Sequence, residues 1–178
     1  MNRLFWIGAA TVFAVLIGLA WMVAKAPEAP RGTETSAGPN TQAFWNATLP
    51  DLKAQPQPMT QHRGKVVVVN FWAPWCPPCR AEMPGFMALQ EKYGKDGVVF
   101  VGIALDRSEN VQRFIAAKPT NYPIYLGEDG GDSLSAALGN HSAALPYTLI
   151  LDRRGEAAGS QVGMLNEARL EAMLRPLL

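Results

Sequence analysis

The chain contains only two cysteines, Cys76 and Cys79, which stand three positions apart in the stretch FWAPWCPPCRAEMP. Two prolines separate them, and Trp75 precedes the first. Two thiols at this spacing could form a redox couple, half of a metal site or a structural disulfide. The chemistry of the chain depends on which of these three interpretations holds.

The structural and metal interpretations are the weaker ones. Closing so short a loop removes about 2 kcal/mol of unfolded-state entropy, against about 4.7 kcal/mol for a hundred-residue loop. A structural zinc site needs four ligands, and the chain could add only His62 and His141. Neither histidine shows ligand spacing, and we expect both to be solvated loop residues. Paired thiolates suit Cu(I) better, so a copper-carrying module remains an alternative.

The redox interpretation explains the arrangement best. A strand that ends at Ala73 and a helix that begins near Pro77 would place Cys76 at or beside the helix N-cap. Unpaired amides and the helix dipole favour a thiolate there, and proline is well tolerated in a first helical turn. Cys79, one turn later, would be less exposed and close enough to resolve a mixed disulfide. We therefore predict that Cys76 attacks a partner's disulfide and that Cys79 releases the product.

The surrounding sequence predicts the elements that position these cysteines. Buried β-branched and aromatic runs predict strands, and apolar residues at helical spacing predict helices. The predicted strands span residues 65–72, 98–105, 122–126, 147–151 and 158–162, and the predicted helices span residues 77–94, 111–117 and 167–174. The last two strands are expected to pair antiparallel. This order implies an α/β fold with a mixed central sheet covered on both faces by helices.

The N-terminal segment predicts export from the cytoplasm. Residues 4–24 are apolar and uncharged, and a helix of that length can cross a bilayer. A cleaved signal peptide is the alternative, although the apolar run is long for one and Pro27 would follow the cleavage site. We expect residues 1–25 to be a membrane anchor or signal sequence, residues 26–41 a flexible linker and residues 42–178 the folded domain.

Composition limits the other classes of function. The 178 residues are 48% hydrophobic, which is enough to build a core, and 16 basic residues nearly balance 15 acidic ones. Because there is no long basic run, the sequence argues against a nucleic-acid partner.

The cysteine stretch, together with the strand VVVVNFWAPW and Leu145-Pro146 before a strand, resembles the thioredoxin superfamily. More narrowly, it resembles the membrane-tethered, extracytoplasmic TlpA/ResA/CcmG-like branch. The resemblance covers about residue 44 to the C-terminus and includes the N-terminal anchor. It implies a thioredoxin-like fold preceded by one transmembrane helix, with Cys76 as nucleophile and Cys79 as resolving cysteine.

The resemblance also implies roles for residues outside the cysteine pair. Pro146 would be a cis-proline that faces the disulfide, and the backbone of Leu145 would pair with an extended substrate. A trans proline that opens an edge strand is the alternative for Pro146. Pro84 would kink the active-site helix. Trp75, with Trp72, would form an apolar rim where a partner docks, although ordinary packing is favoured for Trp72.

Asn70 and Glu82 separate this chain from cytosolic thioredoxin, and Leu145 departs from many relatives. Asn70 stands where cytosolic thioredoxin has a buried aspartate, and Leu145 stands where many relatives carry threonine. Glu82 completes a C-x-x-C-x-x-E pattern of the ResA-like branch, and it lies on the same helical face as Cys79. It could assist proton transfer during resolution, or it could be a solvated glutamate in the first helical turns.

Together these features predict an extracytoplasmic thiol–disulfide oxidoreductase held in the cytoplasmic membrane by a single span, with its catalytic domain facing the periplasm or extracytoplasmic side. It would reduce disulfides in exported proteins, with apocytochrome c as one candidate, and a membrane thiol electron donor would re-reduce it. No dissociable cofactor is implied, because the disulfide is the redox centre. A non-catalytic copper metallochaperone and a disulfide oxidant of the same fold are the alternatives.

Overall fold

Strand β3 (Val66–Trp72) is the centre of a five-stranded sheet with the order β5-β4-β3-β6-β7. It pairs in parallel with β4 (Val98–Ala104) and antiparallel with β6 (Tyr147–Leu151). On the outside, β5 (Ile124–Leu126) runs parallel to β4, and β7 (Ala157–Val162) runs antiparallel to β6. The sheet is therefore mixed, as the sequence predicted.

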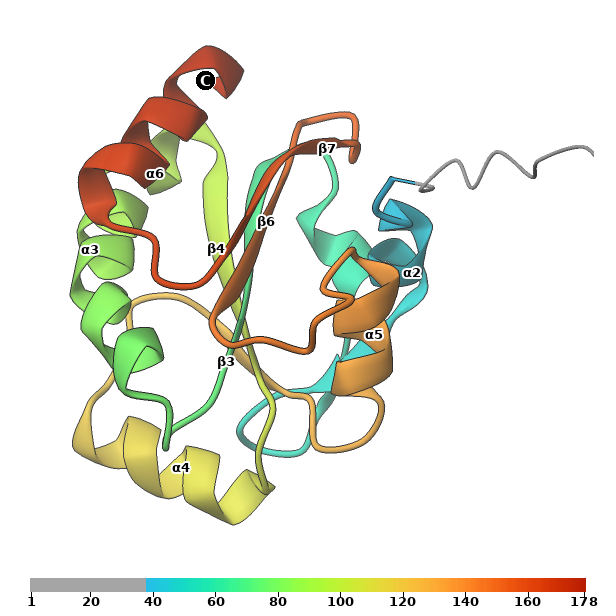
Figure 1. Cartoon of the computed structure of the whole chain (residues 1–178), viewed down its shortest axis with the longest axis vertical. Helices are drawn as coiled ribbons and strands as arrows, with labels where there is room; N and C mark the ends of the chain where they lie inside the picture. The colour runs from blue at the N-terminus through green and yellow to red at the C-terminus, as the bar shows by residue number, and fades with distance from the viewer. Residues whose placement is uncertain (1–37) are drawn as a thin grey trace, which may run out of the picture. The chain divides into compact units, whose positions relative to one another are not determined.

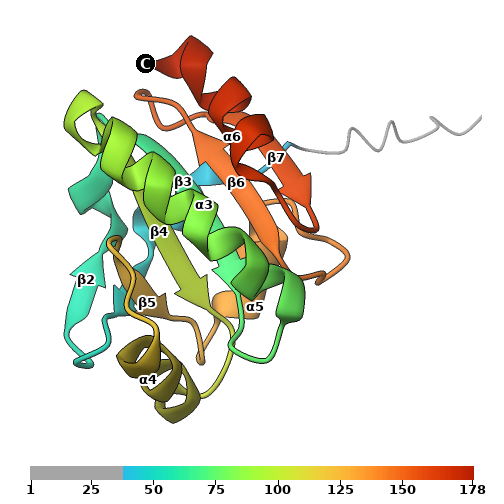
Figure 2. The same cartoon turned by 90° about the vertical axis from the view of Figure 1, so that its left-hand side faces the viewer.

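Helices cover both faces of this sheet in the computed structural model, which describes residues 38–178 (Figures 1 and 2). On one face lie α3 (Pro77–Tyr93) and α6 (Glu167–Leu174), and on the other lie α2 (Thr41–Asn46) and α5 (Gly131–Ala137). The remaining helix, α4 (Ser108–Ala117), contributes Val111 and Ile115 to the core on the α3 side.

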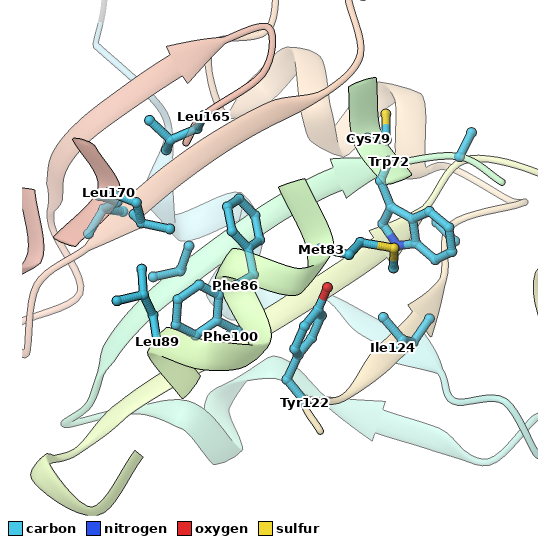
Figure 3. Close-up of a cluster of buried hydrophobic side chains, with 14 of the residues drawn as sticks. Trp72, Cys79, Met83, Phe86, Leu89, Phe100, Tyr122, Ile124, Leu165 and Leu170 are labelled. Carbon is cyan, nitrogen blue, oxygen red and sulfur yellow. The ribbon is translucent and has the colours of Figure 1, made fainter. Parts of the chain in front are cut away.

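The alternating side chains of β3 supply both cores. Successive residues of a strand point to opposite faces, so Val66, Val68 and Trp72 pack beneath α3, and Val67, Val69 and Phe71 pack toward α2 and α5. Figure 3 shows the first of these cores, where side chains from α3 meet those of the sheet and of the segment around Leu165. Because all seven residues of β3 are buried, the strand that leads into the cysteine stretch is firmly held.

The predicted strands and helices are confirmed to within a few residues, but, apart from short 3-10 helices, four elements were not predicted. These are α2, α5 and the two strands of a small hairpin, β1 (Thr48–Pro50) and β2 (Pro56–Pro58), which pair antiparallel. The hairpin strands are three residues long and contain prolines, and α5 is short and rich in small residues. None of them carries enough apolar periodicity to be found from sequence.

The prediction that His62 is a solvated loop residue is wrong. His62 is 6% exposed and ends a short 3-10 helix, η1 (Met59–His62). Its Nε2 atom lies 3.0 Å from the hydroxyl oxygen of Tyr125. The partner is 63 positions away in the chain, so no local pattern could reveal it. His141, by contrast, is exposed as expected.

The predicted anchor, residues 1–25, lies outside the described residues, as does the predicted linker up to residue 37. Between residues 38 and 178, no helix has both the length and the apolar character needed to cross a membrane.

Candidate active site

Cys76 and Cys79 form a disulfide at the N-terminus of α3. Cys76 is the N-cap residue, and Pro77 and Pro78 occupy the first two helical positions, where a missing N–H costs no intrahelical bond. The backbone N–H of Cys79 donates a hydrogen bond of 3.3 Å to Sγ of Cys76. On reduction, a thiolate at Cys76 would be stabilised by this amide and by the helix dipole.

The disulfide is held between the strand and the helix that follows it. After β3 the chain makes a tight turn, in which the N–H of Cys76 donates to the carbonyl of Ala73 at 3.1 Å. Both cysteines are almost fully buried, with Cys76 at 3% and Cys79 at 1% exposure, and they join the core beneath α3. Access to the sulfur atoms therefore depends on the residues that surround Cys76.

Trp75, immediately before Cys76, is the large apolar side chain exposed beside the disulfide. It is 64% exposed and lines two cavities, one of about 370 Å³ shared with Leu145 and one of about 510 Å³ shared with Phe114 of α4. Trp72 differs completely, because it is fully buried and its ring centroid lies 5.4 Å from that of Phe114. Of the two tryptophans, only Trp75 is exposed to solvent.

The Leu145–Pro146 peptide bond is cis and immediately precedes β6. The next residue, Tyr147, pairs with Phe71 near the end of β3, so Pro146 lies at the same end of the sheet as the disulfide. The carbonyl of Pro146 accepts a hydrogen bond of 2.8 Å from the N–H of Gly163. The fold thus brings Trp75, the disulfide and the Leu145–Pro146 segment together from distant parts of the chain.

Glu82 is a buried carboxylate one turn after Cys79, with 4% exposure, and is not solvated. Its Oε1 accepts a 2.8 Å hydrogen bond from Nδ2 of Asn70, and its Oε2 accepts a 3.0 Å bond from the N–H of Leu165. Burial raises the pKa of Glu82 to about 7, and these two hydrogen bonds partly oppose that rise. The site therefore contains a carboxyl group that can take or release a proton near neutral pH.

Sequence reasoning missed two groups near this carboxylate, one that bonds to it and one that bonds to its partner Asn70. Leu165 donates from a loop 83 positions away, and Thr148 of β6 accepts a 3.1 Å hydrogen bond from Nδ2 of Asn70. Neither group can be found from local sequence. A backbone N–H is present at every non-proline residue, and Thr148 is typical of an ordinary strand residue. Across residues 38–178, no group of three or more His, Cys, Asp or Glu side chains is arranged to hold a metal ion.

The fold and site define a thioredoxin-like protein, with a C-x-x-C disulfide at a helix N-terminus beside a cis-proline. The Redoxin family model matches residues 33–174, so the chain belongs to that family. It is 31% identical over 130 residues to the thiol-disulfide oxidoreductase ResA of Halalkalibacterium halodurans, covering 72% of each chain. It is also 28% identical over 114 residues to the sporulation thiol-disulfide oxidoreductase A of Bacillus subtilis, covering 62% of this chain and 67% of that one.

Solved structures agree with this assignment. The crystal structure of a thioredoxin-related protein from Neisseria meningitidis serogroup B matches with a TM-score of 0.65 and 31% identity, over 72% of this chain and 97% of that one. The chain is thus a TlpA/ResA/CcmG-like thiol–disulfide oxidoreductase of the thioredoxin superfamily.

Proposed function

We propose that this protein works as a reductase of disulfides in exported proteins. The observation that supports this most directly is the position of Cys76, which caps α3 beside the exposed Trp75. A thiolate at a helix N-terminus is the nucleophile that disulfide exchange requires, and an exposed tryptophan beside it offers an apolar contact to a partner chain.

The first step forms a mixed disulfide. The Cys76 thiolate attacks one sulfur of the partner's disulfide, and the partner's S–S bond breaks as the new S–S bond forms. The partner's other sulfur leaves as a thiolate and takes a proton from water. Stabilisation of the Cys76 thiolate by the N–H of Cys79 would raise the fraction of nucleophile at neutral pH.

The second step resolves the mixed disulfide. The Cys79 thiol gives its proton to the Glu82 carboxylate, and the resulting thiolate attacks the sulfur of Cys76. The partner's second sulfur leaves and is protonated, the Cys76–Cys79 disulfide remains, and two electrons have passed to the partner. A carboxyl group with a pKa of about 7 suits this role, because about half of it is ionised at pH 7.

Substrate binding would use the cis-proline segment. In this proposal an extended segment of the partner pairs with the backbone of Leu145, next to Pro146, and packs against Trp75. The cavity of about 370 Å³ that both Trp75 and Leu145 line gives room for one of its side chains. Apocytochrome c is one candidate partner.

The cellular setting belongs to the same proposal. Residues 1–25 would anchor the protein in the cytoplasmic membrane, the chain from residue 26 to the start of α2 would act as a tether, and the folded domain would face the periplasm or extracytoplasmic side. Because such compartments are oxidising, a membrane thiol electron donor would return the enzyme to its dithiol form.

The direction of electron flow can be tested by the reduction potential. The purified chain is equilibrated across dithiothreitol and glutathione redox buffers while tryptophan fluorescence is followed. We expect a value near that of thioredoxin, about −270 mV, whereas a value near that of DsbA, about −120 mV, would make the protein an oxidant. The absence of a reversible two-electron transition would defeat the redox proposal and favour a copper metallochaperone, which metal analysis of the purified protein would then test.

A further inference from the structure

The loop before the cis-proline is organised by one buried side chain, that of Asn140. Asn140 is 2% exposed, although it lies between α5 and the exposed residues 141–143. Its Nδ2 donates to the carbonyl of Ala144 at 3.0 Å, and its Oδ1 accepts from the N–H of Ala144 at 3.2 Å. The carboxamide therefore pairs with both backbone groups of Ala144, as a neighbouring strand would.

Other contacts fix the carboxamide in this orientation. Nδ2 also donates to Oγ of the buried Ser135 at 2.9 Å, and the backbone N–H of Asn140 donates to the carbonyl of Ser135 at 3.0 Å. The loop turns back through Ala143, whose φ of 50° lies in the left-handed region and costs an alanine about 1 kcal/mol or more. Because a buried amide is expensive to leave unpaired, these bonds hold Ala144 in one place.

Leu145, the next residue, is left with free backbone groups. Within residues 38–178, no hydrogen bond engages its N–H or its carbonyl, although Ala144 before it and Pro146 after it are both bonded. Leu145 is half-buried and lines the cavity of about 370 Å³ with Trp75. An unpaired N–H and carbonyl between two fixed neighbours form a short edge that an extended chain can pair with.

We propose that Asn140 is a positioning residue for substrate binding: by pairing with both backbone groups of Ala144, it orients the free backbone of Leu145 toward an extended partner chain. This inference rests on the function proposed above, and it adds the residue that holds the Leu145 backbone in place for that pairing. Asn140 touches neither sulfur atom in this scheme, so its loss should affect partners that have a peptide backbone and spare disulfides that lack one.

The test measures single-turnover reduction of two symmetric disulfides by the fully reduced full-length chain. One is the disulfide-linked dimer of a short linear peptide that carries one cysteine, and the other is bis(2-hydroxyethyl) disulfide, which has no amide groups. Symmetry ensures that attack on either sulfur gives the same mixed disulfide. Tryptophan fluorescence reports the reaction, and its dependence on disulfide concentration separates binding from the limiting rate.

We expect Asn140→Ala to lower the second-order rate constant for the peptide dimer by about tenfold, mainly through weaker binding. The rate with bis(2-hydroxyethyl) disulfide should stay within about twofold of the wild type, because the sulfur chemistry is unchanged. The matched control is Ser142→Ala, which removes a 3.3 Å bond to Oδ1 of Asn140 but leaves Ala144 paired, and it should retain both rates.

A peptide dimer N-methylated on both sides of its cysteine supplies a second readout. It should react more slowly than the parent peptide with the wild type, and about equally with Asn140→Ala, because the variant no longer presents Leu145 for pairing. If Asn140→Ala does not fold, Asn140→Asp gives the same test. It keeps an acceptor for the Ala144 N–H but places an oxygen against the Ala144 carbonyl.

The outcomes separate the two proposals. Equal losses with both disulfides would assign Asn140 a purely structural role and overturn the inference, as would unchanged rates with both. If the wild type reduces bis(2-hydroxyethyl) disulfide but not the peptide dimer, the proposed protein-disulfide substrate class itself fails.

Discussion

At the scale of single residues, Trp72 and Trp75 show how two similar side chains three positions apart acquire different roles. Trp72 points from β3 into the core beneath α3 and is fully buried, whereas Trp75 lies after the strand has ended and is 64% exposed. Sequence alone favoured packing for Trp72 and docking for Trp75. The structure supplies the cause, because only Trp72 follows the inward alternation of a buried strand.

This contrast predicts opposite outcomes for the two alanine variants. Trp75→Ala should change the free energy of unfolding by less than about 0.5 kcal/mol, because the ring packs against little. It should nevertheless slow reduction of the peptide dimer. Trp72→Ala should cost about 3–5 kcal/mol, because it leaves a large cavity in the core. Urea unfolding of both variants tests the prediction, and a large loss of stability for Trp75→Ala would show that its ring belongs to the core.

At the scale of elements, the β1–β2 hairpin contains a strained residue. The carboxylate of Asp51 accepts hydrogen bonds from the N–H groups of Lys53 at 2.8 Å and Gln55 at 3.0 Å, which closes the turn. Between these two donors, Ala54 has a φ of 60°, a left-handed conformation that glycine adopts without steric cost. The turn is therefore stabilised by the hydrogen bonds to Asp51 and strained at Ala54.

We expect Ala54→Gly to raise the free energy of unfolding by about 0.5–1 kcal/mol, because relief of strain outweighs the greater freedom of glycine in the unfolded chain. The matched control is Ala88→Gly, at an exposed position within α3. This change should lower the free energy of unfolding by about 1 kcal/mol. Chemical denaturation of the two variants would give opposite signs. Destabilisation by Ala54→Gly would contradict the left-handed assignment.

At the scale of the whole molecule, two buried titratable groups act on stability in opposite directions. Burial raises the pKa of Glu82 from 4.5 to about 7, so the folded state binds this proton more tightly than the unfolded state does. Stability then falls as pH rises from about 4.5 to about 7. Burial, with the nearby charge of Lys65, lowers the pKa of His62 from 6.5 to about 4, so stability rises as pH increases from about 4 to about 6.5.

The two slopes overlap and oppose each other, so we expect the wild type to show a nearly flat stability profile between about pH 4.5 and 6.5 and a decrease from there to about pH 7. In Glu82→Gln the opposing effect is removed, so stability should rise with pH because of His62. His62→Gln should uncover the fall due to Glu82, of order 3 kcal/mol at about 1.36 kcal/mol per pKa unit. Urea unfolding of the oxidised proteins from pH 4.5 to 8 measures these profiles, and parallel profiles for all three proteins would contradict the assignment.

Much of the fold and the centre of the site could be predicted from local sequence. The run that forms β3 is apolar at nearly every position, which is typical of a strand buried on both faces. The two prolines after Cys76 favour the start of a helix, so the placement of the cysteines at the N-terminus of α3 followed from residue chemistry alone. Short elements such as α5 carry too few residues for their periodicity to be recognised.

Tertiary structure decided which polar groups are buried and what they contact. Sequence reasoning left Glu82 open between solvent and function and placed His62 in solvent, because burial of a polar side chain depends on partners far away in the chain. Those partners are Asn70 and Leu165 for Glu82, and Tyr125 for His62.

The pairing of Asn140 with Ala144 spans only four residues. That the backbone N–H and carbonyl of Leu145 stay unpaired, however, can be seen only in the folded structure, where every hydrogen bond around them is known. The sequence by itself determined the reactive pair and the strand and helix that hold it, since these depend on local propensity, whereas the proton-binding and substrate-facing groups depend on contacts that only the folded chain creates.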